Sequence, residues 1–547
     1  MKRPFLFLFA FTTAFGFAQI RFQSLPNPDF IPEAQQATTI VATIAYQGYD
    51  EGQAYFGEGE YQIFPDLING VLDQPIIVLD GFDPGDSRGI GELYASLSFD
   101  GDNLADILRA EGYDIVILNA PQYTTDGKDI DGGADYIQRN AMVLAALIDE
   151  INSQKVGDAE LVILGPSMGG LIARYALAYM EANSLPHETR LYISFDSPHR
   201  GANIPISLQY LINYFAQQVG DPDALAIVEN VLNSPAAKEM LIDHLLAHLL
   251  NGSTYEQDPT KLLPEGAPDF RDAFQTELDN LGFPQEVRNV TMINGSGNGT
   301  TTGSPGAVIV DTNLTIDALT DVDVALNFTP AASQTLTVTD VTVYFISIPI
   351  DSFAADSESS ALTDGVDSAP GGTANIADAL GNGGGNPVLE EFIAALQQDT
   401  YSFIPTMSAL AIDNSDWFAT PNLNDSPFVN FYIPSENEDH VTVTAESAQF
   451  ALDEIRNGGL GITENSEGEL FWVQNPAGKA IKFYATKATA STPLKSAIVN
   501  LAGQKLMEKT WEPGLQEFLW QHQLASGLYL LQLHQGSYSQ VVKLLID

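Results

Sequence analysis

The chain has 547 residues and a formal net charge of −48, a length that accommodates more than one domain. Such strong acidity repels the phosphates of nucleic acids and the surfaces of anionic membranes, so neither is expected as a partner. The sequence contains no cysteine, which excludes disulfides, thiolate metal sites and a cysteine nucleophile.

The first residues have the layout of a signal peptide. A short positive head at residues 1–3 precedes an apolar run from Pro4 to Phe17, and Gly16 and Ala18 supply the small residues of a cleavage point. We therefore predict that residues 1–18 direct export. The apolar run is too short for a membrane anchor, and no other stretch reaches the ~18 apolar residues of a transmembrane helix. No transmembrane anchor is expected.

The next part of the chain alternates short apolar runs with amphipathic segments. The predicted strands are 38–45, 54–64, 75–79, 113–118, 161–164, 191–195, 290–293 and 429–433, and the predicted helices are 103–110, 137–151, 171–180 and 445–455. This alternation predicts an α/β fold over residues 19–460, with a doubly wound, mainly parallel sheet covered on both faces. Such sheets carry their sites at the carboxyl ends of the strands.

One motif on this predicted sheet carries chemistry. Residues 165–169 read Gly-Pro-Ser-Met-Gly, which fits G-x-S-x-G, and they lie between a predicted strand and a predicted helix. A serine on such a sharp turn holds its hydroxyl clear of the sheet, and the flanking glycines let strand and helix approach closely. The helix N-terminus favours the negative charge that develops in acyl transfer. We therefore predict that Ser167 is a nucleophile rather than part of a glycine-rich turn.

Two long insertions interrupt the α/β pattern. Residues 203–285 are rich in helical apolar runs, and we expect a lid-like insertion or acyl-binding wall, with an inert decoration as the alternative. Residues 306–350 alternate like strands and predict a β-hairpin, whereas 351–387 are rich in Ser, Asp and Gly and predict a mobile loop. The acidic segment 126–135 has oxygen ligands suited to calcium but matches no complete loop pattern.

A serine nucleophile needs a base, usually histidine, and the chain has only seven. His522 and His534 lie in the C-terminal region, and His187 lies in a polar connection. His199 follows a strand and could face the substrate or support the site. The pair His244 and His248 has metal-ligand spacing but no third ligand nearby. His440 remains: it lies in a loop after the last predicted strand, late in the chain, which fits the order Ser…Asp…His that accompanies a G-x-S-x-G turn on such a sheet. We predict that His440 is the base.

The acid of the triad is harder to select because acidic residues are abundant. Asp196 ends the predicted strand 191–195 and therefore lies at the active edge of the sheet, where its carboxylate could orient His440. Asp399, Asp364 and Asp367 are rivals, and Asp196 could instead order its own loop. We favour Asp196 and leave the rivals open.

An oxyanion hole needs backbone N–H donors beside the nucleophile. The residue after the nucleophile, Met168, supplies one, and the loop after an early strand should supply the second. That loop is Leu79-Asp80-Gly81-Phe82, so Phe82 is the predicted second donor. No cofactor and no metal are required by this arrangement.

Residues 75–200 and 400–456 resemble a lipase or esterase of the α/β-hydrolase superfamily. Pro75 to Phe82 is similar to the lipase strand that ends in His-Gly, although Asp80 stands in place of the histidine, and 197–201 is similar to Thr-Pro-His-x-Gly. Most bacterial lipases carry their acid after the next strand, but residues 294–299 contain none. The resemblance implies hydrolysis of carboxylic esters without a cofactor.

The chain changes character near residue 470. Residues 471–547 contain seven lysines and four acids and show short alternating strands, which predict a small β-sandwich. The stretches 498–504, 524–529 and 540–545 resemble the C-terminal sorting domain of type IX secretion substrates. This resemblance implies passage through the periplasm and the outer membrane, with the type IX machinery as a partner, and release or attachment at the cell surface. A carbohydrate- or protein-binding sandwich is the alternative.

These observations predict a secreted serine hydrolase of the lipase or esterase type that forms an acyl-enzyme on Ser167. A peptidase or an acyltransferase on the same fold is one alternative, because the strand–turn–helix setting of Ser167, the nucleophile elbow, does not distinguish these activities from ester hydrolysis. A non-catalytic surface-binding protein that uses the fold as a scaffold is the other.

Overall fold

A computed structural model of the protein describes residues 36–380 and 386–457 of the N-terminal part. In the C-terminal part it describes residues 471–473, 480–485, 493–500, 505–513, 515, 517–525, 527–535 and 538–546. The predicted signal peptide at 1–18 lies outside the described residues. The chain divides into two units, Met1–Gly459 and Leu460–Asp547.

An eight-stranded sheet forms the centre of the first unit, in the order β1-β2-β6-β3-β9-β10-β11-β18. The strands are β1 (Thr38–Val41), β2 (Glu58–Phe64), β3 (Pro75–Leu79), β6 (Asp114–Asn119), β9 (Leu161–Pro166), β10 (Thr189–Phe195), β11 (Arg288–Met292) and β18 (Asn430–Tyr432). From β6 to β18 all neighbours are parallel, whereas the β1–β2 and β2–β6 pairs are antiparallel. The prediction of a mainly parallel sheet is confirmed.

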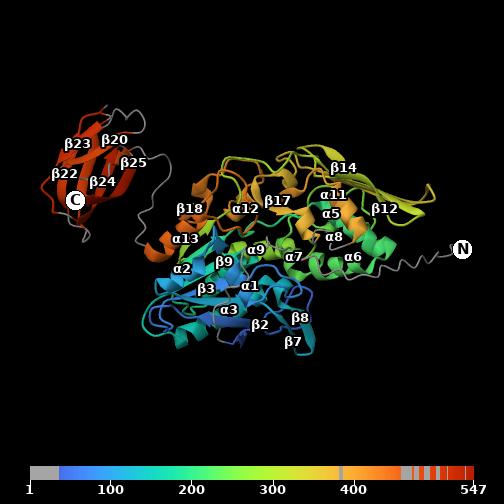
Figure 1. The fold of residues 1–547 in the computed structure, drawn as a ribbon, viewed down its shortest axis with the longest axis horizontal. Helices are drawn as coiled ribbons and strands as arrows, with labels where there is room; N and C mark the ends of the chain where they lie inside the picture. Colours follow the sequence, from blue (N-terminus) through green and yellow to red (C-terminus); the bar gives the residue numbers. More distant parts are fainter. Residues whose placement is uncertain are drawn as a thin grey trace. The chain divides into compact units, whose positions relative to one another are not determined.

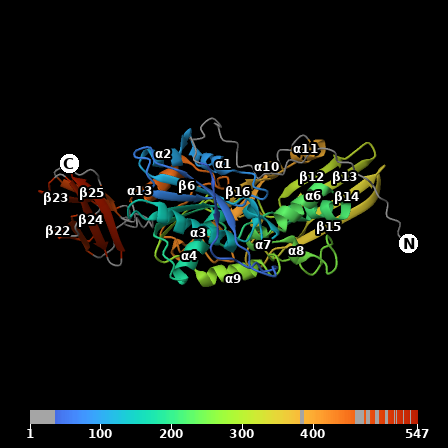
Figure 2. The ribbon, with the colours of Figure 1, turned by 90° about the horizontal axis from the view of Figure 1, so that it is seen from below.

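Helices cover both faces of this sheet because its inner strands are apolar on both sides. Ile77 and Val116 join one buried cluster with α3 (Ile137–Gln154) and α4 (Met168–Ala182). Their chain neighbours Ile76 and Ile115 point the other way and join a second cluster with the helices α1 (Ile90–Ala95), α2 (Leu104–Ala110) and α13 (Ala445–Asn457). Figure 2 shows α3 and α4 on one side of the sheet and α1 and α2 on the other. Two short hairpins, β4 (Ser98–Phe99) with β5 (Asp102–Asn103) and β7 (Gln122–Thr125) with β8 (Lys128–Asp131), lie outside it.

The insertion 203–285 is helical, as its pattern predicts. It contains α5 (Ile206–Tyr214), α6 (Pro222–Ile227), α7 (Pro235–Met240), α8 (Leu245–His248) and α9 (Arg271–Leu281), with π-helical turns at Phe215–Val219 and Val228–Leu232. Tyr214 of α5 stacks on Phe353 of the neighbouring sheet, with ring centroids 5.3 Å apart. Its role as a lid stays a prediction.

The segment 306–387 is not a hairpin followed by a loop, and that prediction is wrong. Four antiparallel strands form one sheet: β12 (Val308–Thr315), β13 (Thr320–Asn327), β14 (Thr335–Phe345) and β15 (Ile348–Glu358). The last strand runs well into the stretch rich in Ser, Asp and Gly because Phe353, Ala355 and Ser357 are buried while their neighbours are more exposed. The alternation of buried and exposed side chains along this strand was not visible in the sequence, because the small Ala355 and the polar Ser357 occupy buried positions. Figure 1 shows the sheet beside α5, α6 and α11.

The rest of that segment returns to the central part of the fold. After a 3₁₀ turn at Val366–Ser368, strand β16 (Gly371–Asn375) pairs antiparallel with β17 (Thr400–Pro405). The short helices α10 (Ile376–Ala379), α11 (Pro387–Ala394) and α12 (Thr406–Ala409) accompany this pair. Among the described residues, no helix combines the length and the apolar character needed to cross a bilayer.

The described residues of the second unit form two antiparallel sheets. One contains β19 (Phe471–Val473), β20 (Ala480–Ala485) and β23 (Glu517–Gln521), and the other contains β22 (Lys505–Trp511), β21 (Leu494–Val499), β24 (Gly527–Gln535) and β25 (Tyr538–Ile546). Phe483 and Phe518 of the first sheet stack 4.7 Å apart and share a buried cluster with Trp511 and Leu531 of the second. The sorting function of this unit stays a prediction.

Candidate active site

Ser167 occupies the turn between β9 and α4. Its backbone angles are φ 52° and ψ −129°, which a serine adopts only under strain. The Ser167 amide donates to the carbonyl of Phe195, 2.8 Å away, and this bond ties the turn to the next strand. A Cβ at Gly165 would lie 2.6 Å from the Gly169 carbonyl oxygen, so the flanking glycines are required for the close approach of strand and helix.

Three residues that are far apart in the sequence meet at this turn. The Nε2 atom of His440 lies 2.9 Å from Ser167 Oγ, and its Nδ1 atom lies 2.6 Å from Asp196 Oδ2. Because the carboxylate can only accept, Nδ1 carries the proton and Nε2 is left to accept from the serine hydroxyl. The three predicted triad residues therefore form a continuous hydrogen-bonded chain.

The imidazole of His440 is held from two sides. Its backbone amide donates to the carbonyl of Thr373 on β16, 2.9 Å away. The ring of Phe403 on β17 meets the imidazole edge to face, with centroids 4.9 Å apart. The β16–β17 pair thus positions the base, although the sequence prediction assigned its first strand to a mobile loop.

Asp196 is completely buried and lies at the end of β10 with φ 47°. Its Oδ1 atom accepts from the Asn294 amide at 3.0 Å, which leaves Oδ2 for His440. Gly372 of β16 lies against this carboxylate so closely that a Cβ there would overlap it. Asn294 follows directly after a predicted strand, so its position at the sheet edge could have been found from the sequence. No pattern in the sequence indicated that Gly372 lies against this carboxylate.

The rival acids take part in other contacts. Asp367 is buried and accepts from Thr329 and from the Asn203 side chain, and this burial raises the pKa of its carboxyl. Asp364 accepts from the Ala332 amide at 2.8 Å. The carbonyl of Asp399 accepts from Ile376. Among the described residues, the carboxylate in hydrogen-bond contact with His440 Nδ1 is that of Asp196.

The other histidines of the first unit have contacts with residues other than Ser167. Burial lowers the pKa of His199 well below its usual value, and its Nε2 atom lies 2.9 Å from Ser194 Oγ. His187 accepts from the Thr189 amide. His244 lies 2.8 Å from the Leu232 carbonyl, and burial lowers its pKa to about 4. His248 pairs with Asp243 at 2.6 Å.

Of the two C-terminal histidines, His534 lies on β24 and His522 accepts from the Leu524 amide. Within the described ranges, no three ligating side chains gather in a way that could hold a metal ion. In the acidic segment 126–135, which has oxygen ligands suited to calcium, three of the carboxylates have other partners. Asp131 accepts from the Gly85 amide, Asp129 accepts from the Thr124 hydroxyl, and Asp135 pairs with Arg139.

The predicted oxyanion loop lies beside the nucleophile. A Cβ built at Gly81 would be 3.1 Å from Ser167 Cβ, so the Gly81-Phe82 peptide passes directly along the elbow. In the part of the chain that the structure describes, neither the Phe82 nor the Met168 amide has a hydrogen-bond partner. Both predicted donors are therefore available next to Ser167.

A salt bridge holds this loop in shape. The guanidinium of Arg88 donates to Asp80 Oδ1 and to the Phe82 carbonyl, each at 2.9 Å. The same carboxylate oxygen accepts from the Gly81 amide at 2.7 Å. Asp80 is buried, and desolvation raises the pKa of its carboxyl to about 6 in spite of the neighbouring Arg88. Asp80 and Arg88 therefore hold the loop on both sides of the peptide that presents the Phe82 amide.

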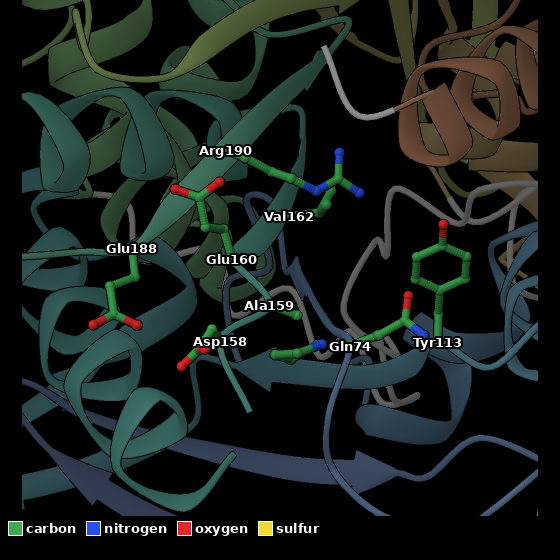
Figure 3. A pocket seen from close by; sticks show the side chains of 9 residues that line it. Gln74, Tyr113, Asp158, Ala159, Glu160, Val162, Glu188 and Arg190 are labelled. Atoms are coloured by element: carbon green, nitrogen blue, oxygen red, sulfur yellow. The ribbon is translucent and has the colours of Figure 1, made fainter. Parts of the chain in front are cut away.

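A cavity of about 550 Å³ lies at the other edge of the sheet. Its walls include Pro75, Tyr113 and Arg190, which stand at the amino ends of β3, β6 and β10. Figure 3 shows Tyr113 and Arg190 among the side chains that line it. Arg190 donates to the Ile455 carbonyl at 2.7 Å. Because parallel sheets carry their chemistry at the carboxyl ends of the strands, this cavity is separate from the Ser167 site.

Comparison with known proteins bears on the same region of the chain. Residues 128–223 match the model of the family described as "Putative serine esterase (DUF676)". This stretch contains α3, β9, α4 and β10, and with them Ser167 and Asp196. None of the curated proteins compared with the chain matches it.

The chain is also similar to several solved hydrolases. The lipase BlEst2 of Bacillus licheniformis is 15% identical in its mature form, with 43% of this chain and 72% of that chain covered at a TM-score of 0.24. Its propeptide form is 10% identical, with 88% and 76% covered at 0.31. Est1E from Butyrivibrio proteoclasticus is 12% identical, with 43% and 74% covered at 0.23. TM-scores this low add no argument to the fold described from its own strands.

The matched family and the site geometry agree on a class of protein. A serine at a strand–helix elbow, hydrogen-bonded to a histidine that contacts a buried carboxylate, is the arrangement of a serine hydrolase. The match to a serine esterase family over residues 128–223 supports the same class.

Proposed function

We propose that the protein is a secreted serine hydrolase that cleaves carboxylic esters through an acyl-enzyme on Ser167. The observation that carries the proposal is the contact of 2.9 Å between Ser167 Oγ and His440 Nε2, backed by the buried Asp196. The family match supports ester hydrolysis over peptide hydrolysis or acyl transfer.

In this mechanism Ser167 Oγ attacks the ester carbonyl carbon while His440 Nε2 takes the hydroxyl proton. The tetrahedral oxyanion accepts hydrogen bonds from the Phe82 and Met168 amides. His440 then gives the proton to the leaving alkoxide oxygen, and an acyl-enzyme remains on Ser167. Water attacks this ester while His440 takes its proton; the bond between the acyl carbon and Ser167 Oγ then breaks, His440 returns the proton to Oγ, and the carboxylic acid leaves. Asp196 keeps the proton on Nδ1 and stabilises the imidazolium.

A direct experiment tests this proposal. Fluorophosphonate labelling followed by peptide mapping is expected to place the adduct on Ser167, and Ser167→Ala is expected to lose hydrolysis of short p-nitrophenyl esters. Wild-type rates in the Ser167→Ala protein would refute the assignment. Parallel assays with peptides and with acyl acceptors separate an esterase from the two related activities.

Export is the second part of the proposal. The signal-peptide layout of residues 1–18 and the resemblance of 471–547 to type IX sorting domains support a route through the periplasm and the outer membrane. Removal of residues 471–547 is expected to leave the hydrolase in the periplasm, as measured by esterase activity in cell fractions. Unchanged appearance of activity outside the cell would contradict this route.

A further inference from the structure

The turn that joins β14 to β15 exposes an apolar cluster, which we call the hairpin tip. Ile346, Ile348 and Ile350 are 59%, 64% and 56% exposed, and Leu319 from the neighbouring turn is 50% exposed. The Ile346 amide donates to the Leu319 carbonyl at 2.7 Å, so the two turns lie side by side. Large aliphatic side chains gathered in this way in solvent mark a surface that contacts something apolar.

The backbone of the hairpin tip is strained to present these side chains. Ile346 has φ 48° and Ser347 has φ 61°, both in the left-handed region. A β-branched residue is a genuine outlier there, and two-residue turns of this kind usually carry Asn-Gly. Asn-Gly would adopt this turn with less backbone strain, so the requirements of the turn do not explain the isoleucine at position 346.

The sheet holds the hairpin tip far from its own base. Strand β14 spans eleven residues, which corresponds to roughly 35 Å at the rise of an extended strand. At the base, Thr329 is bonded to Asp367, which also accepts from Asn203 beside β17. The sheet is therefore attached to the elements that hold His440.

Charge restricts what the hairpin tip can contact. Between Asn289 and Ile455 the sequence contains 23 acidic residues and no lysine or arginine. Asp317, Asp321 and Asp351 flank the tip itself. Such a surface repels anionic lipid, and it equally repels a second copy of this acidic chain. An apolar tip inside an acidic rim fits an uncharged apolar surface.

We propose that the hairpin tip inserts into the uncharged surface of water-insoluble ester aggregates, such as droplets of neutral lipid ester. This proposal rests on the ester hydrolysis proposed above, because droplets of substrate are the uncharged apolar surface that such an enzyme meets. The apolar side chains enter the droplet, and the acidic rim stays in water. The hydrolase is thereby held where its substrate is concentrated.

The test measures adsorption without hydrolysis. Ile348→Ser/Ile350→Ser is made in the full chain with Ser167→Ala, and its partitioning onto triolein droplets is measured by centrifugation. We expect partitioning to fall about tenfold relative to Ser167→Ala alone, because two exposed aliphatic side chains lose their transfer into oil. The matched control is Leu67→Ser/Ile68→Ser, an equally exposed pair at 64% and 68% elsewhere on the unit, which is expected to leave partitioning unchanged.

Three results would overturn the proposal: equal partitioning of the tip variant and its control, equal binding of the protein to anionic phosphatidylglycerol vesicles, or dissociation of a dimer by the tip substitutions in sedimentation. With Ser167 present, the tip variant is expected to hydrolyse a soluble ester at the parental rate and emulsified ester more slowly. If the protein adsorbs to droplets through the hairpin tip but Ser167 is not labelled by fluorophosphonate, the proposed function is wrong and the role of the hairpin tip is retained. If Ser167 is labelled but adsorption does not depend on the hairpin tip, the role of the hairpin tip is wrong and the proposed function is retained.

Discussion

His440 Nδ1 lies 2.6 Å from Oδ2 of Asp196, a carboxylate with no exposure to solvent. The other oxygen, Oδ1, accepts from the Asn294 amide at 3.0 Å. Each carboxylate oxygen therefore has its own donor, which fixes the plane of the carboxylate and hence the tautomer and orientation of the imidazole.

Asp196→Asn is expected to lower kcat for p-nitrophenyl esters by roughly 10³–10⁴-fold with little change in KM, because an amide stabilises the wrong histidine tautomer. Steady-state kinetics at neutral pH measures this effect. Asp364→Asn and Asp399→Asn are the matched controls and are expected to retain kcat. A larger loss in either control would reassign the acid.

Gly372→Ala is expected to lower kcat about 10²-fold, because the added Cβ overlaps the Asp196 carboxylate and displaces the acid from His440. Gly52→Ala is the control, since nothing lies within 4 Å of a Cβ at that position. Kinetics and near-ultraviolet circular dichroism are measured on both. Full activity in the folded Gly372→Ala protein would show that the carboxylate need not lie where the structure has it.

Arg88→Met is expected to lower kcat by about 10- to 10²-fold, because the loop that presents the Phe82 amide loses the guanidinium that binds the carbonyl of the same residue. KM should change little, since the oxyanion forms only after attack. Arg88→Lys, which keeps the charge but donates to fewer acceptors at once, is expected to recover part of the loss. If Arg88→Met changed KM alone, the loop would bind substrate rather than the oxyanion.

The buried Asp80 makes stability depend on pH in a specific window. Its pKa is raised from 3.8 to about 6 by burial, so the folded state binds more protons than the unfolded state between these values. The contribution of Asp80 to the free energy of unfolding is therefore greatest below about pH 4, decreases as pH rises to about 6, and is constant above, with a total change of up to about 3 kcal/mol.

Urea unfolding of the wild-type protein and of Asp80→Asn from pH 4 to pH 8 measures this change as a difference between the two proteins. Asp135, whose pKa burial also raises to about 6, is present in both and cancels. A wild-type minus Asp80→Asn difference that rises with pH in this window would contradict the burial of a protonatable Asp80.

Local patterns were sufficient for much of this protein. The apolar runs and amphipathic segments predicted the parallel sheet, because strand and helix periods are written in consecutive residues. The elbow at Ser167 could be predicted for the same reason, since its strand, turn and helix are contiguous. His440 followed by elimination, because histidines are few and the order of the triad along the chain is restricted.

The tertiary structure decided what depends on distance across the chain. Four aspartates had comparable sequence settings, and only the order β9-β10-β11 in the sheet, with the loop that returns to His440, brings Asp196 to the imidazole. Gly372 and the four-stranded sheet escaped prediction because their partners are remote and their alternation is carried by small polar residues. Sequence specifies contacts between near neighbours through periodicity, whereas a contact across 244 residues exists only once every intervening element has packed.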